Sequence, residues 1–157
     1  MDKKRVVNLV IDYYVRQQKP LGFKPQWPSG RPVYWRDRQG VMKDGMMCSI
    51  GLLVDKSRKM ESFLEEVTDS ESVKSVGMRL FKYINMPRTK ENLEFLTDVQ
   101  KTHDEFAILI EKVSNEEGVI HYNPKVQNHK GKTFVEEMQS LVEKDYSYVN
   151  KVEKPNG

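Results

Sequence analysis

The sequence predicts an α+β protein, a mainly helical single domain with a small antiparallel sheet or hairpin. Apolar residues recur at helical spacing in several segments, and a segment rich in strand formers, 33–36, is followed by turn-forming residues at 37–40. The chain has 157 residues, the usual length of one domain. We expect residues 1–150 to form this domain and residues 151–157 to be a frayed tail.

The first predicted element is a helix over residues 3–18, because its apolar residues form one stripe. Pro20 and Gly22 end this helix. Residues 19–32 contain four prolines, which fix φ and lack a backbone donor, so a loop is predicted there. The stripe consists of Val6, Val7, Val10, Ile11 and Tyr14.

A β-hairpin is predicted after this loop. Residues 33–36 form its first strand, and residues 41–42 begin the return strand. A nearly continuous apolar run follows at 46–54. Periodicity alone does not distinguish a buried strand from a buried helix in this run, so both interpretations stay open.

Two helices are predicted between residues 57 and 87. The first covers residues 57–67, and its inward-facing residues are Met60, Phe63 and Leu64. The second begins at a capping-box pattern, in which Thr68 precedes Glu71 by three residues, and Pro87 ends it.

The longest predicted helix runs from about Thr89 to Val113, with His103 on its apolar stripe. Residues 118–122 read as a short strand and residues 128–132 as a polar turn. A second capping-box pattern opens a last helix. This pattern is formed by Thr133 and Glu136, and the inward-facing residues after it are Phe134, Met138, Leu141 and Val142.

Composition excludes several classes of protein. The 26 basic and 23 acidic residues leave a net charge of +3, which argues against a dedicated nucleic-acid binder, although residues 19–38 are locally basic. A single cysteine, Cys48, excludes an intramolecular disulfide and a zinc site of several cysteines. No segment reads as a signal peptide or membrane span, so we expect a cytoplasmic protein.

No phosphate loop, dinucleotide fingerprint or hydrolase signature occurs in the chain. We therefore expect no cofactor and no metal. The paired acids are interpreted as solvated surface, and they are Glu65-Glu66, Glu116-Glu117 and Glu136-Glu137.

Cys48 is the first candidate for chemistry, because it lies where a turn meets an apolar segment. A thiol at a helix N-terminus is activated by the helix dipole, and a histidine could serve as its base. The order of Cys48, His121 and then Asn123 or Asn128 is that of thiol hydrolases in general terms. The competing interpretation is a buried small apolar residue, the commonest fate of a reduced cysteine.

His103 is the second candidate, with Asp104 beside it and Gln100 one turn earlier. A histidine within an apolar stripe needs a hydrogen-bond partner, because burying an unpaired polar group is unfavourable. The functional interpretation is a pocket that these residues share with Tyr34. The competing interpretation is a core histidine bonded to the backbone.

The third candidate is the aromatic and basic stretch that contains Trp27, Trp35 and Arg36. Arginine next to aromatic rings can clamp phosphates and stack on bases. The competing interpretation is an ordinary hairpin with solvated charges. Together with the second candidate, this stretch predicts a ligand site lined by Tyr34, Trp35, Arg36, Gln100, His103 and Asp104.

Two groups of residues resemble a family of small uncharacterised proteins encoded by phages and prophages. One group is Tyr34, Arg36 and Gly40 followed by Cys48-Ser49-Ile50-Gly51-Leu52-Leu53, and the other is Val99-Gln100-Lys101-Thr102-His103-Asp104. The resemblance covers most of residues 1–113. Cysteines that other members carry are Pro32 and Leu52 here, which argues against a metal or disulfide role at those positions.

The resemblance implies a phage accessory protein that acts in the host cell cytoplasm. Our leading hypothesis is an anti-defence protein that sequesters a nucleotide-like signalling ligand or inhibits a host defence protein. The first alternative is a hydrolase that uses Cys48 and His103, and the second is a small nucleic-acid-binding regulator. The sequence leaves open whether the chain is an enzyme and whether it forms a homo-oligomer.

Overall fold

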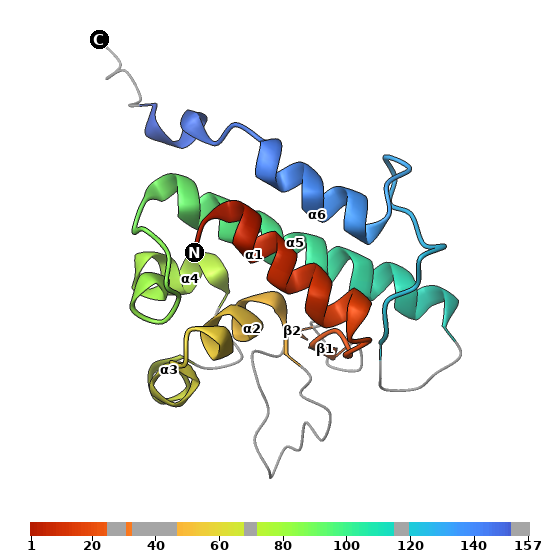
Figure 1. Ribbon diagram of the computed structural model, residues 1–157, viewed down its shortest axis with the longest axis horizontal. Coiled ribbons are helices and arrows are strands. Elements are labelled where there is room, and N and C mark those ends of the chain that lie inside the picture. The colour runs from red at the N-terminus through yellow and green to blue at the C-terminus, as the bar shows by residue number, and fades with distance from the viewer. Residues whose placement is uncertain (25–30, 33–46, 68–71, 115–119, 152–157) are drawn as a thin grey trace.

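The computed structural model of the protein describes residues 1–24, 31–32, 47–67, 72–114 and 120–151, and these residues are mainly helical (Figure 1). The α-helices are α1 (Lys3–Ile11), α2 (Ser49–Lys56), α3 (Met60–Glu66), α4 (Val73–Val76), α5 (Lys90–Val113) and α6 (Phe134–Glu143). The π-helix η1 (Asp12–Arg16) and the 3₁₀-helix η2 (Gly77–Lys82) directly follow α1 and α4, and a second 3₁₀-helix, η3 (Ser147–Asn150), comes after α6.

The α+β prediction is wrong, and the protein belongs to the all-α class. In the described part of the chain, strand pairing is limited to two residues each of β1 (Phe23–Lys24) and β2 (Arg31–Pro32), with isolated bridges from Leu21. The apolar run at 46–54 contributes helix α2, and Ile120 of the predicted strand at 118–122 makes one such bridge. The predicted hairpin strands at 33–36 and 41–42 lie outside the described residues.

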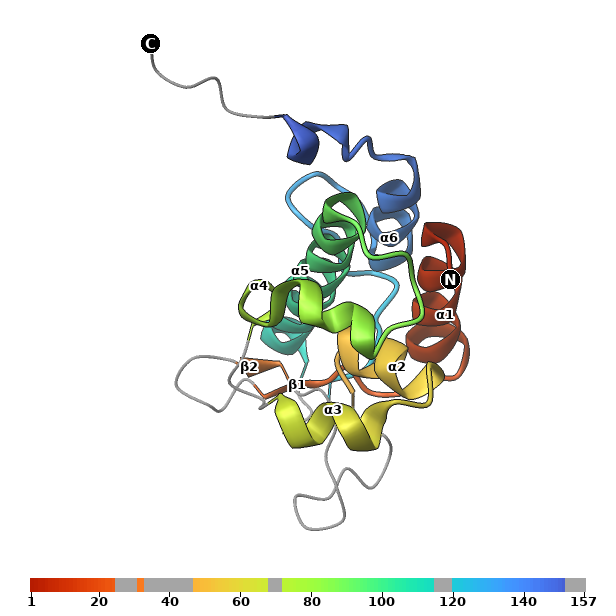
Figure 2. The same ribbon diagram turned by 90° about the vertical axis from the view of Figure 1, so that its left-hand side faces the viewer.

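Helix α5 runs through the middle of the protein and packs against α1, α2, α4 and α6. The two views agree that α1 and α6 lie alongside α5 (Figures 1 and 2), whereas α3 contacts α2 and α4 contacts α5. Helix η3 returns to α5 beyond the end of α6. The long helix therefore supplies one wall of most of the interior.

The core between these helices is rich in aromatic rings. Phe134 of α6 meets the rings of Tyr14 and Phe106 edge to face, with centroids 6.2 and 5.6 Å apart. At the other end of α5, Phe95 meets Tyr146 in the same way at 5.9 Å. Edge-to-face pairs stabilise a core beyond the area that they bury, so these rings join η1, α5, α6 and the segment after α6 into one unit.

Several boundaries follow the sequence prediction. Helix α5 begins after Thr89, whose side chain accepts from the Asn92 amide, and ends at Val113. The capping box of Thr133 and Glu136 is present at the start of α6. Helix α1 and the π-helix together cover residues 3–16, close to the predicted 3–18.

Other details differ from the prediction. Helix α4 is capped by Ser72, and the predicted capping pair Thr68 and Glu71 lies outside the described residues. Leu64, expected to face inward, is 36% exposed, and Val113 at the end of α5 is 65% exposed. Both lie near helix ends, where fewer neighbouring elements cover the stripe. Within the described residues, no helix is long and apolar enough to cross a membrane.

Candidate functional site

Gln100, His103 and Asp104 come together on one face of α5, as the sequence predicted. The Oδ1 atom of Asp104 lies 2.8 Å from both the Gln100 Nε2 atom and the His103 Nδ1 atom. Gln100 and His103 are buried, and Asp104 is partly exposed. One carboxylate oxygen therefore links the two buried side chains.

His103 is fully buried and bonds to the backbone of a distant segment. Its Nε2 atom accepts a hydrogen bond of 3.1 Å from the Gly22 amide. Because an atom that accepts from an N–H carries no proton, the hydrogen-bond network assigns the neutral Nδ1–H tautomer, which donates to Asp104. The Tyr14 ring lies against the imidazole at 5.3 Å between centroids. This is the core histidine bonded to the backbone that the sequence offered as the competing interpretation.

Gln100 caps the N-terminus of α2. Its Oε1 atom accepts from the Ile50 amide at 3.1 Å, one of the first amides of a helix, which lack partners within the helix itself. The Nε2 group of the same side chain donates to Asp104. The two ends of one amide thus connect α2 to the polar cluster on α5.

Cys48 is the N-cap residue of α2, and its Sγ atom accepts from the Gly51 amide at 3.5 Å. The residue is 0% exposed. Catalysis by this thiol requires access for a substrate, and the described structure gives none. The asparagines proposed as its partners serve local turns instead, since Asn123 accepts from the Lys125 amide and Asn128 from that of Lys130.

The backbone of Met47 and Cys48 makes close contacts next to this polar cluster. The Tyr14 hydroxyl, presented by the π-helix, donates to the Met47 carbonyl. Gly22 lies against the same backbone, because a Cβ built on it would overlap the nitrogen of Cys48 and the carbonyl carbon of Met47. Burial is the largest cause that raises the pKa of Tyr14, so its hydroxyl keeps its proton for this bond.

Half of the predicted ligand site cannot be placed against this cluster, because Tyr34, Trp35 and Arg36 lie outside the described residues. The pocket between a hairpin and the long helix therefore stays a prediction. The structure instead describes a structural contact, which we call the joint. In it, the side chains of His103 and Gln100 accept hydrogen bonds from the backbone amides of Gly22 and Ile50.

A second polar region lies between α5 and α6 and contains a cavity of about 390 Å³. Its volume falls in the range of small-molecule sites. Charged side chains of both signs and two hydroxyl groups line it. The lining residues are Asp98, Lys101, Thr102, Glu105, Lys130, Glu137, Ser140, Leu141 and Lys144, and we call this cavity the α5–α6 pocket.

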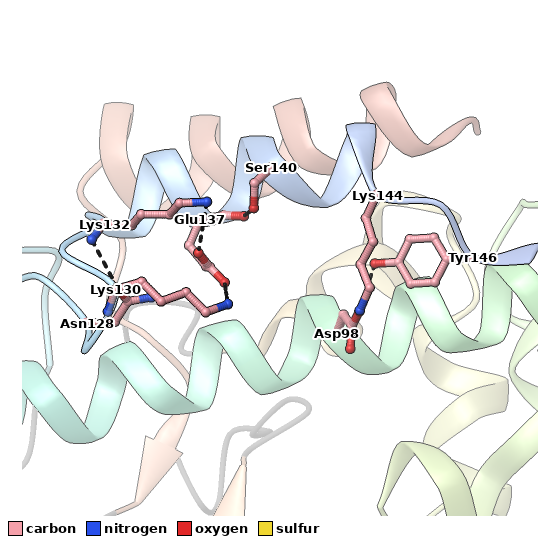
Figure 3. A network of polar contacts seen from close by, with 8 residues as sticks. All are labelled: Asp98, Asn128, Lys130, Lys132, Glu137, Ser140, Lys144 and Tyr146. Atoms are coloured by element: carbon pink, nitrogen blue, oxygen red, sulfur yellow. Dashed lines mark hydrogen bonds and ion pairs between the residues drawn. The ribbon is translucent and has the colours of Figure 1, made fainter. Parts of the chain in front are cut away.

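Glu137 and the turn before α6 form one end of this pocket (Figure 3). Glu137 is only 8% exposed, and its Oε1 atom lies 3.3 Å from the Lys130 Nζ atom. The Lys132 ammonium lies 3.9 Å from Oε2, an ion pair that is too long for a hydrogen bond. The turn is shaped by Asn128, whose Oδ1 atom accepts from the amides of Lys130 and Lys132.

Asp98 and Lys144 form the other end (Figure 3). The Lys144 Nζ atom and the Tyr146 hydroxyl both donate to Asp98 Oδ2, each at 2.8 Å. The hydrogen bond to Asp98 is the main reason why the pKa of Lys144 is raised. Burial, and then the same carboxylate, raise the pKa of Tyr146. Both donors therefore keep their protons around neutral pH.

The sequence missed this second region, and the interpretation of Glu137 as solvated surface is wrong. Helical spacing indicates that Glu137 is buried, because it lies three residues after Phe134 and four before Leu141, on the inward face of α6. Its neighbours Lys130 and Lys132 lie in the predicted polar turn. The pairing of Asp98 with Lys144, 46 residues later, has no such local signal.

The described residues contain no group of three or more histidine, cysteine, aspartate and glutamate side chains that could hold a metal ion. No protein-family model matches the sequence, and comparisons with curated proteins and with solved structures give no significant match. The candidate site therefore rests on its own geometry.

Proposed function

We propose that the chain is a non-catalytic binding protein that holds a small anionic, nucleotide-like ligand in the α5–α6 pocket. The observation that carries the proposal is that three lysines line one cavity. The ammonium groups of two of these lysines are bonded to carboxylates, which fix their positions. These are Lys130, bonded to Glu137, and Lys144, bonded to Asp98. An ammonium group that is already positioned loses less conformational entropy when it binds an anion.

The absence of catalysis is supported by what the nucleophile and base candidates do. Cys48 is buried and caps a helix, and both ring nitrogens of His103 are engaged in hydrogen bonds. A hydrolase would need an accessible nucleophile with a base in reach. The hydrolase alternative therefore ranks below binding.

The resemblance to phage and prophage proteins supplies the setting for this proposal. In the cytoplasm of an infected cell, such a protein would act against host defence by sequestering a nucleotide-like signal. Direct inhibition of a host defence protein ranks second, because the large apolar side chains exposed on the described residues are scattered singly, as on most surfaces. Those side chains are Leu64, Ile108, Val113 and Tyr148.

Native mass spectrometry of the protein purified from an expressing cell tests the proposal directly. We expect a small molecule to be released on denaturation, and titration calorimetry with inorganic phosphate and nucleoside monophosphates to detect binding. A variant that carries both Lys101→Gln and Lys130→Gln should lose that binding. The matched control is Lys125→Gln, an exposed lysine outside the pocket. A chain that releases nothing and binds none of these anions refutes the proposal.

A further inference from the structure

Resting on the proposed function, we infer that the α5–α6 pocket selects a ligand with a single phosphate or carboxylate group and discriminates against polyphosphates. The reason is the balance of charge around the cavity. Its lining includes three lysines, and the same lining includes three carboxylates. The lysines are Lys101, Lys130 and Lys144, and the carboxylates belong to Asp98, Glu105 and Glu137.

The charges of the lining residues cancel, and the nearby ammonium of Lys132 adds one positive charge through its ion pair with Glu137. The net charge of about +1 therefore neutralises roughly one negative charge of a ligand. Sites for triphosphates instead surround the phosphates with lysine, backbone amides and a metal ion. Each further phosphate placed in this pocket would lie beside a carboxylate and be repelled by it.

The lysines at the two ends are held in place and partly neutralised by carboxylates, so we expect the strongest anion contact from Lys101. Lys130 bonds to Glu137 and Lys144 to Asp98, at opposite ends of the cavity (Figure 3). No ion pair joins Lys101 to a carboxylate among the described residues. Its positive charge is therefore the least compensated in the lining.

The remaining polar lining suits an uncharged, hydroxyl-bearing part of the same ligand. The Ser140 hydroxyl donates to the Glu137 backbone carbonyl at 2.6 Å, which leaves its oxygen to accept from a ligand. Thr102 adds a second hydroxyl on the α5 side. A sugar that carries one phosphate, as in a nucleoside monophosphate, combines both features.

Titration calorimetry with AMP and ATP, without divalent cations, tests the inference on the full chain. We expect AMP to bind more tightly than ATP. Glu105→Gln removes one negative charge without touching the pairs that hold Lys130 and Lys144, so it should improve ATP binding by about tenfold relative to AMP. Lys101→Gln should weaken AMP binding by about tenfold. Glu111→Gln, on an exposed part of α5 outside the lining, is the matched control and should change neither.

The outcomes distinguish failure of the single-phosphate inference from failure of the proposed binding function. Tighter binding of ATP than AMP by the wild type overturns the single-phosphate inference and leaves the binding function standing. An unchanged ratio of the two affinities in Glu105→Gln also overturns the inference. Failure of the wild type to bind either nucleotide or inorganic phosphate overturns the proposed function itself. Circular dichroism of each variant confirms that a lost signal does not reflect unfolding.

Discussion

Replacing Gly22 with alanine should destabilise the protein strongly, because residue 22 has no room for a side chain. The added Cβ would overlap backbone atoms of Met47 and Cys48, and it would lie 2.6 Å from the Met47 carbonyl oxygen. Backbone cannot rotate away as a flexible side chain can, so the segment around residue 22 has to move. Overpacking of this kind typically costs about 1–3 kcal/mol.

That movement also breaks the hydrogen bond from the Gly22 amide to His103. Leaving a buried donor or acceptor unpaired costs about 1–3 kcal/mol. The expected loss is therefore about 2–6 kcal/mol, out of a total stability of about 5–15 kcal/mol. With a urea m-value of about 2 kcal/mol/M, the midpoint of unfolding should fall by about 1–3 M.

Urea unfolding followed by circular dichroism measures this loss, and Gly131→Ala is the control. Gly131 has a φ of +73° and no atoms within 4 Å of an added Cβ, so its substitution adds only backbone strain of about 1–2 kcal/mol. In a double-mutant cycle, His103→Ala should couple to Gly22→Ala and not to Gly131→Ala. A loss below about 1 kcal/mol for Gly22→Ala, or no coupling to His103, would refute the proposed joint.

Three further predictions concern the same region. Gln100→Leu should cost about 1–3 kcal/mol by leaving the Ile50 amide without its acceptor, and hydrogen exchange of that amide should accelerate more than exchange in α6. Native Cys48 should resist thiol reagents and react only on unfolding, and rapid native labelling would contradict its burial. Burial, and then Asp55, raise the pKa of Tyr13 from 10.0 to about 12, so its contribution to stability is present below pH 10 and declines as pH rises toward 12. An alkaline titration should show its phenolate forming together with loss of helix, and a native phenolate near pH 10 would contradict this.

The sequence predicts the helices that have one buried face and fails where a helix is buried all round. Helix α5 has a regular apolar stripe and a capping threonine, so both its type and its ends were predictable. In α2, every residue from Ser49 to Val54 is buried, so no stripe exists to reveal the helical period. Its N-terminus is held by Gln100 from 50 residues away, a contact that no local pattern shows.

The candidate site was predictable to a similar degree. The grouping of Gln100, His103 and Asp104 follows from their spacing on one helix, and the structure confirms that they bond to one another. Their other partners are the amides of Gly22 and Ile50. Because every residue except proline has a backbone amide, no sequence pattern shows which amide a side chain will bond. For this reason the sequence could identify the polar cluster but could not tell a joint from a ligand site.

The segments 48–53 and 99–104 meet in this joint, because the bond from the Ile50 amide to Gln100 connects the first segment to the second. A motif whose side chains hold backbone segments together specifies a fold, and a fold can carry many functions. The α5–α6 pocket is lined instead by other side chains, including Lys101 and Thr102 of α5 and Lys130, Glu137, Ser140 and Lys144 from beyond Val113. Substitutions of Gln100 and His103 should therefore lower stability and spare ligand affinity in the surviving folded fraction, whereas Lys101→Gln should lower affinity and spare stability. Comparing urea midpoints with calorimetric affinities for both sets measures this separation, and a Gln100 or His103 variant of native stability that has lost binding would place the ligand at the joint instead.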